Sequence, residues 1–263
     1  MKQILLLGAD IDSPNNGVNA LTLGTLAALV KRYPDGFCID IINIGGNSEY
    51  ETQVEIDGAL ISIKKHRPHV NLLTRTIIIG YLFKLLSSQK FDRWFAQGNK
   101  LANLIHSAEI VIDLSEGDSF SDIYGNVRFF VHFLYKLLPG IGSAPLFLFP
   151  QTIGPFRTWY NRLLARIALG RATRVFTREA YSSKIVAQLI PDKSRLSEAS
   201  DMAFLMQPQP VAVVPAAVAA QGYVGVNVSG LLYFNLDPGN LRWNATLYRK
   251  FMKQIVEYFV LEA

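Results

Sequence analysis

Polar side chains are concentrated in residues 113–125, directly after the apolar segment 110–112. Ser115, Asp118 and Ser119 are among the side chains of this turn that could hold a polar ligand through hydrogen bonds. In open α/β sheets ligands bind at the carboxyl ends of the strands, so a turn of this composition after a strand predicts a substrate site. The alternative is a loop of Asp and Ser turns that satisfy only their own backbone and cap the next helix.

Two later strand-like segments also end in polar groups. The first leads to Gln151 and Thr152, whose side chains could bind either a sugar hydroxyl or the nearby backbone. The second leads to Arg178 and Glu179. The Arg178 guanidinium could hold a phosphate or carboxylate through two parallel hydrogen bonds, or it could form a structural ion pair with Glu179.

A glycine turn, residues 8–17, joins the first expected strand to the first expected helix. The backbone amides near Asn16 and Gly17, together with the positive end of the helix, could receive a phosphate or carboxylate. Helix capping alone is the alternative. The turn does not have the G-x-G-x-x-G spacing, which argues against a nicotinamide or flavin cofactor. Further along the chain, Asp201 either caps the end of the first domain or orients an acceptor hydroxyl.

Short apolar, β-branched runs alternate with helical periodicity along most of the chain. This alternation predicts an α/β fold with a parallel, Rossmann-like sheet, whose right-handed crossovers bring the carboxyl ends of the strands to one edge. The expected strands are residues 4–7, 37–42, 59–64, 110–114, 146–149 and 174–177, and the expected helices are residues 17–33, 71–88, 99–107, 127–138, 159–169 and 181–189.

A change of composition predicts two domains. Residues 1–206 form the first, and residues 207–221, rich in proline, alanine and valine, form a linker. Residues 222–263 then resemble the beginning of a second α/β domain, with a buried strand over 223–230 and an amphipathic helix over 246–261. One strand and one helix bury too little surface for a core. We therefore expect a truncated second domain, or one whose missing surface another chain covers.

Composition limits the classes of function. The 263 residues carry a formal net charge of +5 without a dense Lys/Arg run, which favours a small anionic substrate over nucleic acid; weak attraction to an acidic membrane surface is the alternative. Cys38 is the only cysteine and no two histidines have metal-ligand spacing, so no metal site is expected. The first residues lack a signal-peptide pattern and the apolar run 77–86 is too short for a bilayer. We expect a cytoplasmic protein, either free or at the inner face of the membrane.

Five segments, in this order and spacing, resemble the polysaccharide pyruvyl transferase family: residues 8–19, 113–125, 150–156, 175–179 and 199–204. The resemblance covers about residues 4–235 and implies a glycosyltransferase-B-like fold with two Rossmann-like domains. It also implies transfer of a pyruvyl group from phosphoenolpyruvate to two hydroxyls of a glycan or lipid-linked sugar, which forms a pyruvate ketal. No cofactor besides this donor substrate is implied.

The resemblance also implies roles for individual residues. Asp118 would orient the acceptor or act as a base, and Arg178 would bind the donor. The substrate-binding residues that it implies are Asn16, Gly17, Ser115, Gly117, Ser119, Gln151, Thr152, Glu179, Asp201 and Asn227. Relatives commonly have Gly-Gly-Asp where this chain has Glu116, Gly117 and Asp118. The glutamate adds bulk and negative charge beside the expected donor site.

The resemblance also implies a histidine in the second domain that faces the donor across the interdomain cleft, but no residue after Ser229 is a histidine. The chain is therefore expected to be either inactive alone or part of an active enzyme. Two rival classes remain. One is a nucleotide-sugar glycosyltransferase of similar fold. The other is a non-catalytic interaction fragment, or a homo-oligomer, that docks through the helix expected over 246–261.

Overall fold

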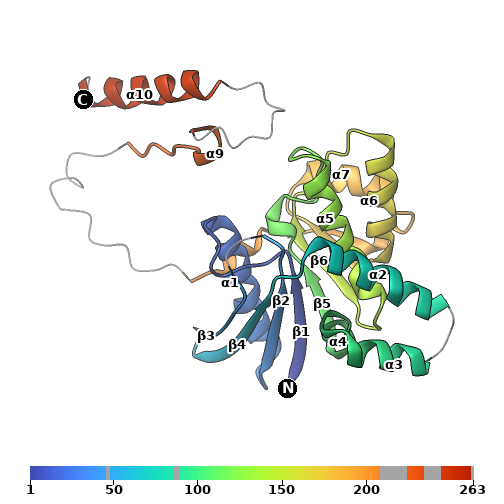
Figure 1. Cartoon of the computed structure of the whole chain (residues 1–263). Coiled ribbons are helices and arrows are strands. Elements are labelled where there is room, and N and C mark those ends of the chain that lie inside the picture. The colour runs from blue at the N-terminus through green and yellow to red at the C-terminus, as the bar shows by residue number, and fades with distance from the viewer. Residues whose placement is uncertain (46–47, 86–88, 208–223, 234–243, 262–263) are drawn as a thin grey trace. The chain divides into compact units, whose positions relative to one another are not determined.

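The computed structural model describes residues 1–45, 48–85, 89–207, 224–233 and 244–261. The chain divides into two compact units, residues 1–207 and residues 208–263, which we call unit 1 and unit 2 (Figure 1). The polar strand ends predicted from the sequence belong to unit 1, except for Asn227. None of the described helices is both long enough and apolar enough to cross a bilayer.

Unit 1 is built on an eight-stranded sheet in the order β3-β4-β2-β1-β5-β6-β7-β8. Every neighbouring pair runs parallel except β3 and β4, which are antiparallel. The strands are β1 (Lys2–Leu7), β2 (Phe37–Ile42), β3 (Tyr50–Ile56), β4 (Ala59–His66), β5 (Ile110–Asp113), β6 (Leu146–Gln151), β7 (Arg174–Thr177) and β8 (Leu196–Glu198). The predicted α/β class with a mostly parallel sheet is confirmed.

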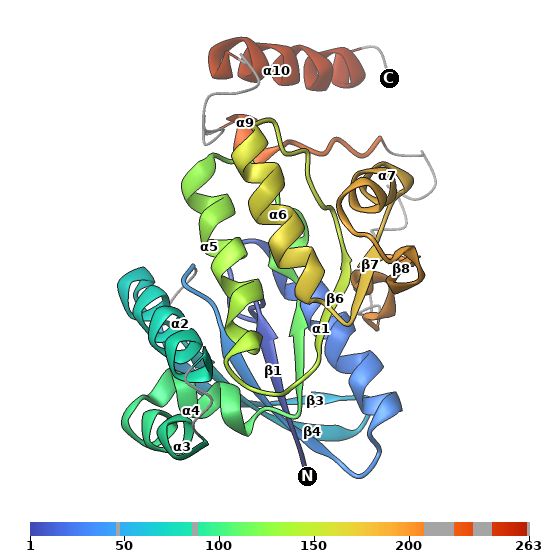
Figure 2. The ribbon, with the colours of Figure 1, turned by 90° about the vertical axis from the view of Figure 1, so that its right-hand side faces the viewer.

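Helices cover both faces of this sheet (Figure 2). They are α1 (Asn16–Arg32), α2 (Val70–Leu85), α3 (Gln89–Gly98), α4 (Lys100–Ser107), α5 (Asn126–Leu137), α6 (Trp159–Arg171) and α7 (Ala180–Leu189), with short 3-10 turns at η1 (Ser115–Gly117), η2 (Leu138–Gly140), η3 (Lys193–Arg195) and η4 (Met202–Leu205). The helix expected over 71–88 ends at Leu85 within the described residues. Because both faces are covered, the inner strands carry apolar runs such as residues 4–7 and 110–112.

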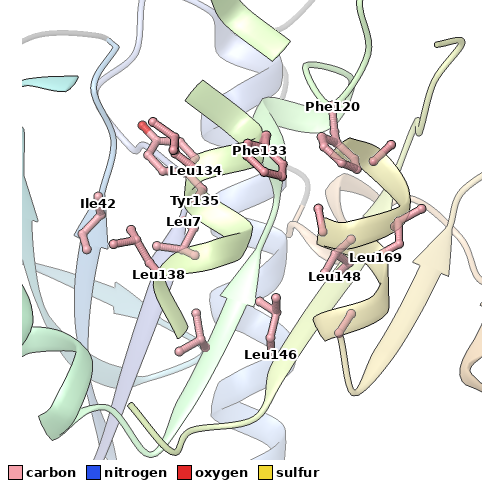
Figure 3. Packing of buried hydrophobic residues seen from close by; sticks show 14 of the residues in the cluster. Leu7, Ile42, Phe120, Phe133, Leu134, Tyr135, Leu138, Leu146, Leu148 and Leu169 are labelled. Carbon is pink, nitrogen blue, oxygen red and sulfur yellow. The ribbon is translucent and has the colours of Figure 1, made fainter. Parts of the chain in front are cut away.

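Alternate residues of β1 enter two separate cores, as the two-residue period of a strand requires. Leu5 and Leu7 pack in the core beneath α2, α4, α5, α6 and α7. Figure 3 shows Leu7 in this core with Leu134 of α5, Leu138 of η2 and the neighbouring strand residues. Ile4 and Leu6 point to the other core, beneath α1. The sheet is thus fixed from both sides, which makes its carboxyl edge a rigid base for a site.

The predicted strands include β4, expected over 59–64, but not β3 and therefore not the β3–β4 hairpin. Asp57 and Gly58 form its two-residue turn, with φ angles of 50° and 79°. Two left-handed residues in an Asp-Gly pair fit the turn whose twist matches that of antiparallel strands. The hairpin places an antiparallel strand at one end of an otherwise parallel sheet.

Unit 2 contains two described helices, α9 (Gly230–Tyr233) and α10 (Ala245–Leu261). The predicted strand over 223–230 is wrong for its described part, because residues 224–229 form no strand. The Tyr248 hydroxyl instead accepts a hydrogen bond from the Ser229 amide, which ties this segment to α10. Apart from Gln207, the predicted linker at 207–221 lies outside the described residues. The assignment of residues 222–263 to a truncated α/β domain remains a prediction.

Candidate functional site

A cleft of about 470 Å³ opens at the carboxyl edge of the sheet. The strand order reverses here, because β2 lies on one side of β1 and β5 lies on the other. The lining residues come from the loops after β1, β2 and β5 and from α1 and α5: Ser13, Pro14, Asn15, Val18, Asn43, Ile44, Gly45, Glu116, Arg128, Val131, His132 and Tyr135. Ligands of open α/β sheets bind in a crevice at such a reversal. The cleft is therefore the candidate site of unit 1.

The loop after β5 enters the cleft in an unusual backbone conformation. Ser115, Glu116 and Gly117 all have left-handed φ angles, of 45°, 52° and 91°. Glycine tolerates this conformation, whereas each of the two other residues is strained by about 1–3 kcal/mol. Gly8 is needed beside them, since a Cβ at Gly8 would lie 3.0 Å from the Ser115 backbone. A strained backbone conformation persists only where surrounding contacts stabilise it. At functional sites such a conformation often sets the direction of a side chain.

A buried cluster of three side chains holds the strained loop. The Lys136 ammonium donates to both carboxylate oxygens of Asp113 at 3.1 Å and to the Ser115 hydroxyl at 2.6 Å. The Ser115 hydroxyl in turn donates to Asp113 at 2.6 Å. All three residues are fully buried, and the ammonium lies 3.8 Å from the centre of the Phe120 ring. Burial lowers the pKa of Lys136, and the Asp113 charge partly opposes this. The cluster is a support beneath the cleft, out of reach of a ligand.

The strained backbone directs Glu116 into the cleft. Arg128 of α5 donates to its Oε2 through Nη2 at 2.6 Å, and the Arg128 Nε donates to the Ser119 hydroxyl at 2.9 Å. The Ser119 hydroxyl donates weakly to the same Oε2, at 3.4 Å. The other carboxylate oxygen, Oε1, has no hydrogen-bond partner in the described part of the chain. Glu116 is therefore fixed by one oxygen and available through the other.

His132 forms part of the cleft wall beside this pair. Its Nε2 lies 4.0 Å from Glu116 Oε2, and its buried Nδ1 has no hydrogen-bond partner among the described residues. Burial lowers the pKa of His132 well below the usual 6.5, and the charges of Lys136 and Arg128 lower it further. The imidazole is thus neutral at pH 7, and it leaves Arg128 as the cation that holds Glu116.

The neutral state of His132 predicts a dependence of stability on pH. Between pH 6.5 and the lowered pKa, the unfolded chain binds a proton at this residue and the folded chain does not, so stability falls as pH falls. The loss is at most about 1.4 kcal/mol per pH unit from this residue. Urea unfolding of wild type and His132→Gln between pH 7.5 and 5.5 should show a shallower acid dependence in the variant. Equal slopes would contradict the buried neutral imidazole.

A second polar group lies at the ends of β6 and β7. Arg178 donates through Nε to the Thr152 hydroxyl at 2.9 Å and through Nη1 to Asp201 at 2.7 Å. Glu179 lies 3.6 Å from the Arg178 Nε and accepts from the Thr152 hydroxyl at 3.2 Å. The Arg178 side chain is 26% exposed, so it can still meet a ligand from solvent. Its main partner is Asp201, not the adjacent Glu179.

Asp118 lies on the same loop as Glu116, two residues further along the chain. The Tyr124 hydroxyl donates to Asp118 at 2.6 Å. Burial, together with the Asp118 carboxylate, raises the pKa of Tyr124 to about 12, so the phenol stays a proton donor at pH 7. The Gly117 turn separates Asp118 from Glu116, and a Cβ at Gly117 would lie 2.7 Å from Leu21 of α1. The loop thus presents two carboxylates in different surroundings.

Comparison with known proteins identifies the family. The sequence model described as polysaccharide pyruvyl transferase matches residues 17–262, nearly the whole chain. The chain belongs to the polysaccharide pyruvyl transferase family. The assignment made from the five sequence segments is therefore confirmed, and the family indicates a transferase with a glycan acceptor.

Two further comparisons add little to the family assignment. A search of curated proteins finds no match. Among solved structures, one described as trehalose-6-phosphate from E. coli bound with UDP-2-fluoro glucose matches with 11% identity and a TM-score of 0.42. The match covers 84% of this chain and 54% of that one, so this chain spans about half the length of the structure it matches. A similarity this low supports no inference about ligand or activity.

The structure places the predicted site residues in three settings. Thr152, Arg178, Glu179 and Asp201 come together at the ends of β6 and β7, while Gly117, Asp118 and Ser119 follow Glu116 on the loop after β5. Asn16 and Gly17 lie in the first turn of α1, and the residue that lines the cleft is Asn15, whose side chain accepts from the Gly17 amide as the helix cap. Asn227 is an exposed residue of unit 2, and its role remains a prediction.

Gln151 and Ser115 are both fully buried, and Gln151 binds the backbone, which is one of the two roles expected for it. The Gln151 amide donates to the backbone oxygen of Asp113 at 3.0 Å, and Ser115 belongs to the cluster with Lys136. Their polar groups therefore support the edge of the sheet from below, and direct ligand contact is not available to them in this structure.

Other cleft residues were not predicted from the sequence. Glu116 was expected only to add bulk and negative charge beside the donor site. Arg128 and Tyr135 were not singled out, and the histidines were considered only as metal ligands. The helical spacing of Arg128, His132 and Tyr135 puts them on one face of α5, which was a usable signal. What the spacing does not give is that this face meets the loop after β5.

Proposed function

We propose that this chain takes part in pyruvyl transfer from phosphoenolpyruvate to two hydroxyls of a glycan or lipid-linked sugar. The product is a cyclic pyruvate ketal, and phosphate is released. The observation that carries the proposal is family membership together with a polar cleft at the strand-order reversal of unit 1.

The reaction sets demands that these side chains can meet. One hydroxyl must lose a proton as its oxygen bonds to C2 of the donor, C3 must gain a proton, and the phosphate must leave with the electrons of its C–O bond. A carboxylate suits the first step, and an arginine suits the negative charge of donor and phosphate. In this proposal Arg178 binds the anionic donor, and hydrogen bonds to the donor replace part of its bonding to Asp201. Asp118 is the candidate for orienting the acceptor or acting as the base.

Thermal unfolding with added phosphoenolpyruvate tests the proposal. A ligand that binds only the folded state raises its stability by RT ln(1 + [L]/Kd), so phosphoenolpyruvate at about 100 times Kd should stabilise the chain by about 2.7 kcal/mol. A panel of nucleotide sugars and inorganic phosphate serve as controls. A shift with a nucleotide sugar and none with phosphoenolpyruvate would favour a glycosyltransferase instead. No shift with any of them, combined with concentration-dependent self-association, would favour the interaction fragment.

Arg178→Ala separates donor binding from general stability in the same assay. The expected result is a donor affinity at least several-fold weaker than in wild type, because the guanidinium is lost. Arg174→Ala is the matched control: Arg174 is an exposed residue of β7 that donates only to the Ser194 backbone among the bonds described. An unchanged phosphoenolpyruvate affinity in Arg178→Ala would show that this arginine does not bind the donor and is only a structural partner of Asp201.

A further inference from the structure

The cleft at the strand-order reversal differs in character from the Arg178 group. Its cation, Arg128, is already paired with Glu116 at 2.6 Å, so the pair brings no net charge. The remaining polar contributors are neutral, namely Ser13, Asn15 and Asn43. A doubly charged donor gains little from such surroundings.

Apolar groups stand beside the polar ones in the same cleft. Val18, Ile44 and Val131 line it together with the Tyr135 ring. A pyranose has hydroxyls at its rim and C–H groups on its faces, so mixed neutral surroundings of this kind match a sugar. The volume of about 470 Å³ lies within the range of small-molecule sites. The cleft therefore suits a saccharide better than an anionic donor.

We propose that Glu116 is the catalytic base of the transfer, and that it takes the proton from a hydroxyl of a saccharide held in this cleft. The inference rests on the proposed function and replaces Asp118 in the role of base. Both carboxylates keep one oxygen without a hydrogen bond among the described residues, but Glu116, with a side chain that is 16% exposed, lines the cleft and Asp118 does not.

The proton transfer balances with the rest of the reaction. As the hydroxyl oxygen forms its bond to C2 of phosphoenolpyruvate, its O–H bond breaks and the proton moves to Glu116 Oε1. The electron pair of the donor double bond takes a proton from solvent at C3, which becomes a methyl group. The phosphate then leaves with the C–O electron pair and takes the proton of the second hydroxyl, whose oxygen bonds to C2 in its place, and Glu116 returns its own proton to solvent. In sum, the two hydroxyl protons end on the methyl carbon and on phosphate.

The surroundings prepare Glu116 for this role. Arg128 holds Oε2 and so fixes the direction in which Oε1 points. The left-handed conformation at Ser115 and Glu116, held by buried Lys136, keeps the carboxylate in the cleft. Neutral His132 closes the wall 4.0 Å from the carboxylate without competing as a cation. A strained backbone locked by buried contacts is how a site holds a reactive group in place.

The first measurement tests whether the cleft binds a saccharide. Saturation-transfer NMR of the full chain with a panel of methyl hexopyranosides should show binding to wild type, and Val131→Phe, which fills the cleft from α5, should weaken it at least tenfold. If Val131→Phe does not fold, Ile44→Phe fills the cleft from the loop after β2. No binding to wild type, or equal binding to a folded filled variant, would overturn the saccharide site. This arm does not depend on phosphoenolpyruvate.

The second measurement tests the base. With the bound hexopyranoside and phosphoenolpyruvate, Glu116→Gln should lower the rate of ketal formation by about 100-fold or more, while saccharide affinity stays within about threefold of wild type. Glu55→Gln, on the exposed edge strand β3, should match wild type in both. A rate lost in Asp118→Asn and kept in Glu116→Gln would overturn the assignment. Saccharide binding without ketal formation in wild type would reject the proposed function and the base role together, and leave the saccharide site standing.

Discussion

Replacing Lys136 with Met is expected to lower the free energy of unfolding of unit 1 by about 3–5 kcal/mol. The substitution keeps most of the side-chain volume but leaves the Asp113 carboxylate fully buried without its cation. It also removes the donor to Ser115 and the charge over the Phe120 ring. Removing one partner of a buried pair costs more than the pair itself contributes, since the remaining charge cannot be solvated.

Urea denaturation followed by circular dichroism measures this loss, and an exposed pair provides the control. Lys64→Met breaks the ion pair between Lys64 and Glu51, whose side chains are 49% and 70% exposed, and should cost no more than about 1 kcal/mol. Adding Asp113→Asn to Lys136→Met should restore part of the stability, because no buried charge is then unpaired. A loss in Lys136→Met as small as that in Lys64→Met would contradict the supporting role of the cluster.

The predicted effect extends from stability to the cleft. Lys136 holds the left-handed turn at Ser115, and this turn directs Glu116 toward Arg128. A variant that folds without the lysine should therefore lose the geometry of Glu116 even though residue 136 does not line the cleft. Burying the Lys136 ammonium costs free energy. Its position is explained by its effect on Glu116, the candidate catalytic group, which it orients through Ser115.

The sequence predicted most of unit 1 because its signals are local. Two expected strands, over 37–42 and 174–177, coincide with β2 and β7. Short β-branched runs between helical segments can be recognised from the sequence alone. The hairpin was missed although its signals were present. Apolar or β-branched residues alternate with polar ones through residues 50–56, and the Asp57-Gly58 pair is a strong turn signal.

The candidate site could be predicted only as far as the sheet edge. That polar loops gather at the carboxyl ends follows from the parallel topology. Which loop residues are buried does not follow, because it depends on contacts distant in sequence. A lysine such as Lys136 is expected on the surface unless it has a buried partner. That partner is Asp113 of β5, whereas Lys136 lies on α5. His132 likewise gained its place from the packing of α5 on the sheet.

Gly24 of α1 is a position where the usual effect of a glycine substitution should reverse. Alanine in a helix interior normally stabilises by about 1 kcal/mol relative to glycine. A Cβ at Gly24, however, would lie 1.8 Å from the backbone oxygen of Met202 and 2.7 Å from its carbonyl carbon. These atoms belong to η4, whose backbone cannot move aside as a flexible side chain could. Gly24→Ala should therefore destabilise unit 1 by about 3 kcal/mol, the upper end for overpacking.

Gly170 near the end of α6 provides the matched control, since a Cβ there meets nothing within 4 Å. Gly170→Ala should raise the thermal unfolding temperature of the same chain, while Gly24→Ala should lower it by several degrees. The clash also bears on the donor group, because Asp201 caps η4 and holds Arg178 at 2.7 Å. If η4 moves away to admit the methyl group, Gly24→Ala should weaken phosphoenolpyruvate binding as Arg178→Ala does. Stabilisation by both alanines would show that η4 does not pack on α1 as closely as the distance between Gly24 and Met202 requires.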